Sequence, residues 1–269
     1  MNRTGYRFWA LVCVMALLAG FAEMAGISRW KNAKAASLEE TETPPGFQME
    51  VIAVSMSRSR QKRVFLYHTH TFEAYEIDPE NRYVQTEKWR TADHRYNVVR
   101  VGEELTANLQ SAGVFVTHDV TDYEMPRLSS AYARSLEGLK EAAEAGYDLY
   151  IDLHRDSYSS GNGVNTVPVD GTETARLLIL IGQGTGSSLE DKPDWEENQC
   201  AAQVISDALN ERTEGLCRGV SLKSGRYNQQ AAIPSMLIEV GNNKNILPEA
   251  LAAAEPLARA ICRYLDGME

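Results

Sequence analysis

Apolar runs of strand length alternate with segments of helical period through most of this chain. Runs that favour β-structure occupy residues 64–67, 114–117, 147–153, 177–181 and 236–238. Helical periods cover residues 98–112, 130–145, 196–212 and 248–265, and Gly113 and Gly146 follow the first two of them. Because strands that alternate with helices form layered α/β domains, we predict a mainly parallel sheet with flanking helices.

Three of the predicted strands lead into histidine or glutamate. The run 64–67 is followed by His68-Thr69-His70, the run 147–153 by His154, and the run 236–238 by Glu239. In an open α/β sheet, ligands and catalytic groups collect outside the carboxyl ends of the strands. We therefore expect a mononuclear hydrolytic metal site that the fold assembles from these distant segments.

Zinc is the metal that this residue set favours. Catalytic zinc usually has three protein ligands and one open position, and neutral imidazole is a frequent donor. His70 and His154 are the first two candidate ligands, and the third is Asp93 or His94, with Glu73 in reserve. The competing interpretations are a structural hydrogen-bonding role for each histidine and a helix N-cap role for Asp93.

Other polar residues of these strand ends have expected roles around the metal. Glu239 follows an apolar run, where an unpaired carboxylate is costly to bury, and it is the candidate general base. Its alternative role is an ion pair with Arg155, which itself is a candidate to neutralise a substrate carboxylate or a developing oxyanion. His68 is expected to orient its neighbours or to serve as an alternative ligand.

The composition is that of a folded protein and excludes some partners. The chain has 43% hydrophobic and 24% charged residues and a formal net charge of -10, without a basic aromatic stripe, so nucleic-acid binding is not expected. The glycine-rich run 182–186 lacks the spacing of a nucleotide-binding loop, so no nucleotide is expected. The cysteines contain no CxxC pair and do not match a thiolate zinc site.

The amino-terminal segment has the features of a membrane anchor. Residues 8–26 are almost wholly apolar and follow Arg3 and Arg7. A cleaved signal peptide is the alternative, with Ala33-Lys34-Ala35 as the cleavage site. We expect a cytoplasmic start and anchor helix over residues 1–27, a polar linker over 28–50 and a catalytic domain over 51–269. This single-pass arrangement would hold the domain outside the cytoplasm at the cell membrane.

Five ordered blocks of the sequence resemble the stage II sporulation protein P family, over about residues 63–265. They are Tyr67-His68-Thr69-His70-Thr71-Phe72-Glu73, then the runs 97–102 and 151–156, then Tyr227-Asn228-Gln229, and finally the run 235–241. The resemblance implies a zinc-dependent N-acetylmuramoyl-L-alanine amidase with an amidase-like α/β fold. It also implies a place in wall remodelling during sporulation.

The resemblance further implies roles for individual residues. The pattern of the wider amidase group places ligands at His70 and His154 and the catalytic glutamate at Glu239. Its glutamate ligand falls near Asp93, where aspartate is a departure from that group. Zinc would lower the pKa of a bound water that attacks the lactyl carbonyl of muramic acid, and Glu239 would pass the proton to the alanine amine.

The resemblance also suggests what the chain contacts. Tyr227, Asn228 and Gln229 would line the substrate groove. The implied partners are peptidoglycan, a lytic transglycosylase and other sporulation membrane proteins.

Two other functions compete with this prediction. The same zinc site would serve a peptidase or a γ-glutamyl hydrolase acting on the stem peptide. A membrane-tethered wall-binding scaffold with a degenerate site is the non-enzymatic alternative. The products released from purified muropeptides distinguish the two enzymatic functions, and metal binding distinguishes the scaffold.

Overall fold

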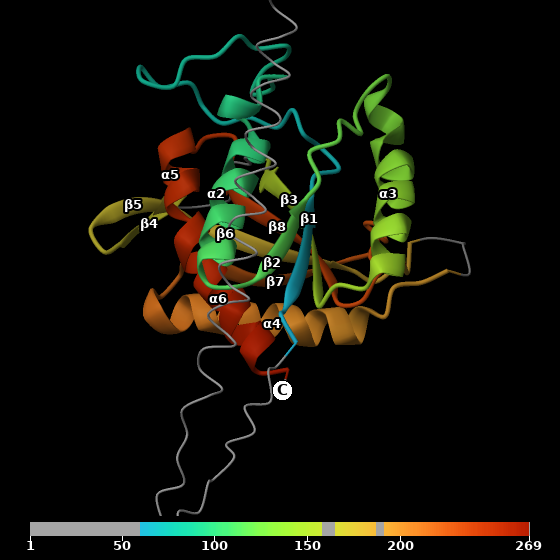
Figure 1. The fold of residues 1–269 in the computed structure, drawn as a ribbon. Helices are drawn as coiled ribbons and strands as arrows, with labels where there is room; N and C mark the ends of the chain where they lie inside the picture. The colour runs from blue at the N-terminus through green and yellow to red at the C-terminus, as the bar shows by residue number, and fades with distance from the viewer. Residues whose placement is uncertain (1–59, 158–164, 187–190, 269) are drawn as a thin grey trace, which may run out of the picture. The chain divides into compact units, whose positions relative to one another are not determined.

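A mixed six-stranded sheet forms the centre of the structure, which is a computed structural model (Figure 1). In the order β2, β1, β3, β8, β6, β7, the strands are Phe115–His118, Arg63–Tyr67, Leu149–Asp156, Ser235–Asn242, Leu177–Gly182 and Cys217–Lys223. The first four strands are parallel, whereas β6 pairs antiparallel with β8 and parallel with β7. The predicted layered, mainly parallel α/β sheet is thus confirmed, with one antiparallel pairing that the sequence did not indicate.

The structure describes residues 60–157, 165–186 and 191–268. The predicted anchor and linker lie outside these residues. Among the described helices, none is both long and apolar enough to cross a membrane. The segment Arg58–Glu269 forms a compact unit of its own.

Helices cover both faces of the sheet (Figure 1). On one face, α2 (Val98–Ser111), α4 (Trp195–Arg212), α5 (Leu247–Ala252) and α6 (Ala254–Asp266) pack against a large apolar cluster. On the other face, α3 (Ala131–Ala145) packs with Phe65, Tyr67 and Tyr150 in a smaller cluster. Val64 and Leu66 belong to the large cluster, so alternate residues of β1 are buried on opposite faces, as the period of a strand requires.

The predicted helices form close to their expected bounds because the chain supplies their ends. Asn97 caps α2, its side chain accepting a hydrogen bond from Val99 N, and Gly146 ends α3 with a φ of 66°. The segment predicted as one final helix is two, α5 and α6, which meet at Ala253. Short 3-10 turns, η1 (His94–Tyr96) and η2 (Leu128–Ser130), precede α2 and α3.

Three strands were not expected from the sequence. The hairpin of β4 (Thr166–Val169) and β5 (Thr172–Ala175) is largely polar, although its Asp170-Gly171 turn, with φ of 48° and 82°, is a common hairpin signal. Edge strand β7 is mostly half-buried or exposed and lacks an apolar run. Strands β3 and β8 are also longer than predicted, so His154 and Glu239 lie within them rather than beyond their ends.

Candidate active site

His154 and Glu239 lie directly opposite each other on neighbouring parallel strands. Residues of β3 and β8 pair in register from Tyr150 with Ser235 to His154 with Glu239, and the register shifts just beyond that pair. This pairing brings together two residues that are far apart in the sequence. Strands β3 and β8 thus carry their polar groups side by side, toward the carboxyl ends of both strands.

The loop after β1 brings His70 and Glu73 to the same place. The rings of His70 and His154 are nearly perpendicular, with centroids 5.3 Å apart. Glu73 Oε2 lies 3.3 Å from His154 Nδ1. Burial disfavours the ionised form of Glu73, yet the charges of His154 and Arg155 outweigh it and lower the pKa of Glu73. Glu73, the reserve candidate of the sequence analysis, therefore lies beside both histidines.

Asp152 holds the other side of His154. Its Oδ1 lies 2.8 Å from His154 Nε2 and accepts a hydrogen bond from Thr69 N, while Oδ2 accepts one from the Thr69 hydroxyl. Burial lowers the pKa of His154, but the carboxylates of Asp152 and Glu73 outweigh it and raise that pKa well above its ordinary value. The sequence analysis missed this role of Asp152, although its spacing of two residues from His154 places both on one face of β3.

Glu239 is a partly buried carboxylate in the middle of β8. Its Oε2 is buried and has no hydrogen bond. Burial raises the pKa of Glu239 to about 8, and the positive charge of His154 acts against this shift. The alternative role of Glu239 was an ion pair with Arg155. The contacts of that arginine are with other groups, so they do not support this role.

Arg155 is engaged within the protein. Its Nε donates to Ala74 O, its Nη2 donates to Trp89 O, and its backbone N donates to Glu73 Oε2. Its guanidinium also lies 3.8 Å from Glu73 Oε1. These contacts fix Glu73 and the loop that carries it, and they give no support to the expected role toward a substrate carboxylate.

Asp93, a predicted third ligand, has the helix-capping role that was its alternative in the sequence. Its side chain caps η1 by accepting from Arg95 N and forms an ion pair with the Arg95 guanidinium at the surface. His94 is the first residue of η1 and is only partly buried. The carboxylate in contact with His154 is that of Glu73. As candidate third ligand we therefore place Glu73 ahead of Asp93 and His94, which reverses the order expected from the sequence.

His68 belongs to a buried histidine pair on the α2 side of the sheet. Its Nδ1 donates to Leu153 O at 2.8 Å, so its Nε2 accepts the hydrogen bond from His118 Nε2, also at 2.8 Å. Burial lowers the pKa of His68 to about 3, so the ring is neutral. These contacts are with Leu153 and His118, so the expected role of His68 toward the metal ligands stays a prediction.

Two of the three predicted groove residues are structural. Asn228 donates to Tyr132 O and Ser135 Oγ, and the Gln229 side chain bonds Gly182 N and Leu180 O. The ring of Tyr227 instead packs edge-on against Tyr132, with centroids 6.0 Å apart. Tyr132 in turn lies 5.6 Å from the His70 ring, so α3 supplies an aromatic wall that sequence reasoning missed.

These residues suit zinc by their chemistry. The rings of His70 and His154 lie together beside Glu73, and two histidines with one glutamate form a known catalytic zinc set. Within the described ranges, no three His, Cys, Asp or Glu side chains already stand as a formed metal cluster. The donor types nevertheless fit the metal.

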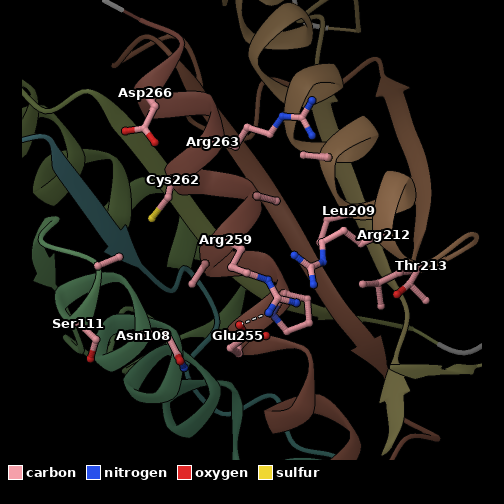
Figure 2. A pocket seen from close by; sticks show the side chains of 16 residues that line it. Asn108, Ser111, Leu209, Arg212, Thr213, Glu255, Arg259, Cys262, Arg263 and Asp266 are labelled. Atoms are coloured by element: carbon pink, nitrogen blue, oxygen red, sulfur yellow. Dashed lines mark hydrogen bonds and ion pairs between the residues drawn. The ribbon is translucent and has the colours of Figure 1, made fainter. Parts of the chain in front are cut away.

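A separate cavity is lined by other residues (Figure 2). It has a volume of about 640 Å³ and is lined by the ends of α2 and α4 and by α6. Val98, at the start of α2, donates to Glu73 O, whereas the cavity borders Ser111 at the other end of that helix. Two of its arginines are paired, Arg259 with Glu255 and Arg263 with Glu211, and we assign this cavity no part in the site.

Comparisons with known proteins give one family and several similar structures. The family model described as stage II sporulation protein P (SpoIIP) matches residues 24–262. The protein of that name from Bacillus subtilis (strain 168) is 29% identical over 218 residues, which cover 74% of this chain and 50% of the relative. The chain thus spans half the length of that relative.

Among solved structures, the chain is similar to the CwlD amidase from Clostridioides difficile, determined with the GerS lipoprotein. That similarity has 17% identity and a TM-score of 0.49, and it covers 77% of this chain and 100% of that one. The N-acetylmuramoyl-L-alanine amidase AmiC2 of Nostoc punctiforme is similar at 14% identity and a TM-score of 0.47, covering 76% of this chain and 97% of that one.

Proposed function

Because the chain belongs to the stage II sporulation protein P family, we propose that it is a zinc-dependent N-acetylmuramoyl-L-alanine amidase acting on peptidoglycan. The observation that carries the proposal is the convergence of His70, Glu73, His154 and Glu239 from three segments of the chain. Such a set has the ligands and the free carboxylate that amide hydrolysis requires.

His70, Glu73 and His154 are the residues that would hold zinc. When bound there, zinc would act as a Lewis acid that polarises the scissile carbonyl and makes water a better nucleophile. Arg155 keeps Glu73 in place, and Asp152 keeps His154 in place. These outer contacts limit the motion of both side chains before any substrate arrives.

Glu239 would handle the proton. Water adds to the carbonyl carbon and loses a proton to the Glu239 carboxylate. The bond between that carbon and the alanine nitrogen then breaks, and Glu239 returns the proton to the departing amine. A carboxylate with a raised pKa suits this cycle, because it binds the proton firmly enough to carry it from the water to the departing amine.

The location and partners belong to the same proposal. An anchor over residues 1–27 would hold the domain on the outer side of the cell membrane, within reach of the wall. A lytic transglycosylase would complement the amidase, because removal of stem peptides and cleavage of glycan strands together dismantle the polymer.

Dye release from labelled peptidoglycan by the purified full-length chain tests the proposal. We expect zinc-dependent release by the wild type, and a loss of about 10²–10⁴-fold in Glu239→Gln, since general acid-base catalysis contributes that much. Glu214→Gln, at an exposed glutamate, is the matched control and should keep full activity.

Product analysis separates amidase from peptidase activity. Free stem peptides with an unblocked L-alanine amine support the amidase, whereas shortened peptides still attached to muramic acid would show a peptidase or γ-glutamyl hydrolase. Wild-type protein that retains no zinc and releases no dye would instead favour the wall-binding scaffold.

A further inference from the structure

Glu124 is a buried carboxylate that none of the site predictions included. It is 4% exposed and lies in the segment between β2 and η2, far in sequence from β1 and β3. Burying a charge is costly unless it is paired and hydrogen-bonded. The contacts of its two oxygens therefore need an explanation.

The two oxygens have different surroundings. Oε2 is bound by the Arg90 guanidinium, so one side of the carboxylate is neutralised. Oε1 receives only a long contact from Phe72 N, at 3.4 Å, and lies 3.3 Å from His70 Nδ1. That nitrogen is buried and makes no hydrogen bond. A free acceptor and an unsatisfied ring nitrogen thus face each other.

We propose that Glu124 is a positioning residue that sets the orientation and tautomer of His70. This inference rests on the proposed zinc site. A neutral imidazole has one N–H and one lone pair, and a nearby acceptor decides which nitrogen carries the proton. A proton on Nδ1 directed at Glu124 leaves the lone pair of Nε2 free for a metal.

Arg90 makes the carboxylate suitable for this role. The ion pair with Arg90 occupies Oε2 and leaves Oε1 as the acceptor that faces His70. The backbone around Arg90 is tied to the His70 loop, because Thr91 N donates to Phe72 O and Ala74 N donates to Trp89 O. The arrangement parallels the second histidine, where Asp152 lies 2.8 Å from His154 Nε2. Each histidine thus has its own carboxylate.

Zinc affinity, measured by competition with a chromogenic chelator on the full-length chain, tests the proposal. Glu124→Ala should lower the affinity about 10–100-fold, the usual effect of removing a partner of a metal-binding histidine. Glu124→Gln should retain most of it, because the amide oxygen still accepts a hydrogen bond. Glu87→Gln is the control, since Glu87 also pairs with Arg90 but is exposed.

A second measurement does not depend on whether the variants fold. Nitrogen-15 NMR of the zinc-free wild type should show the His70 ring protonated at Nδ1. A ring protonated only at Nε2 would overturn the proposal.

Each other outcome of the titration is decisive. Unchanged zinc affinity in Glu124→Ala, with a lowered melting temperature, would show that Glu124 only braces Arg90. A loss in Glu124→Gln as complete as in His70→Ala would make Glu124 a ligand instead, and would also overturn the positioning role. Failure of the wild type to bind zinc would reject the proposed function itself, so the two failures are distinguishable.

Discussion

A carboxylate can contribute to the candidate site only if the backbone directs its side chain toward the other site residues. The Glu73 side chain is 13% exposed and faces His154, whereas the Asp93 side chain is 34% exposed and faces Arg95. Both precede the same helix, and both were candidates in the sequence. Their positions along the chain decide between them, because Glu73 follows β1 closely and its Oε2 accepts a hydrogen bond from Arg155 N of β3.

The first prediction separates these two carboxylates by zinc binding. Glu73→Gln should lower zinc affinity by more than the roughly 10–100-fold that outer contacts contribute, because it removes a charged ligand. Asp93→Asn should leave the affinity unchanged and cost at most about 1 kcal/mol of stability, as a weakened cap. Chelator competition gives the first quantity and urea unfolding the second. The reverse ranking would restore Asp93 as the ligand.

The residues that sequence analysis identified are those that a strand pattern can reveal. His154 and Glu239 follow apolar runs, and period and composition are enough to place such residues near the end of a parallel strand. Glu124 lies in an irregular segment and acts through tertiary contacts, so no local pattern distinguishes it from a surface carboxylate. For Asp152, the only local signal is its spacing of two residues from His154 on β3. The partners of Arg155, Ala74 O and Trp89 O, are backbone atoms of an irregular loop, so the sequence does not reveal them. Without known partners inside the protein, Arg155 was expected to face the substrate.

At the scale of elements, α2 approaches β1 and β2 closely at a glycine. A Cβ added to Gly102 would lie 2.7 Å from His118 Nε2 and 2.8 Å from His68 Nε2. The buried histidine pair therefore occupies the space that a side chain would need. In the sequence, Gly102 is only a residue of low helix propensity within a helical period. The structure gives the reason for a glycine at this position, which is the close approach of the two histidines.

The second prediction concerns this contact. In an open helix, Gly→Ala stabilises by about 0.5–1 kcal/mol, but Gly102→Ala should destabilise by about 1–3 kcal/mol because of overpacking. Urea unfolding measures the change. In a His118→Ala background the same substitution should be tolerated better, and the double-mutant cycle gives the coupling. A more stable Gly102→Ala protein would contradict the close approach.

At the scale of the whole molecule, the candidate site lies at the carboxyl ends of the strands, whereas the bulk of the core lies on one face of the sheet. The parallel strands β1, β3 and β8 carry the candidate site at their carboxyl ends, while the large apolar cluster under α2, α4 and α6 supplies most of the core. One pair of titratable side chains lies between these two regions. His68 and His118 are held neutral on the core side, so folding and proton binding are linked there.

The third prediction is therefore a loss of global stability in acid. Burial lowers the pKa of His118 from 6.5 to about 4, with Asp119 acting to raise it and His94 to lower it further. Between these values the unfolded chain binds more protons than the folded chain at this residue, so its contribution to stability is complete above pH 6.5 and declines toward pH 4. Urea unfolding at several pH values across that interval measures the slope.

His118→Gln keeps an amide donor for His68 and should flatten the slope, whereas His94→Gln, at a partly exposed histidine, should not. An equal slope in His118→Gln and wild type would show that the pKa of His118 does not change on folding, and would exclude it as the acid-sensitive group.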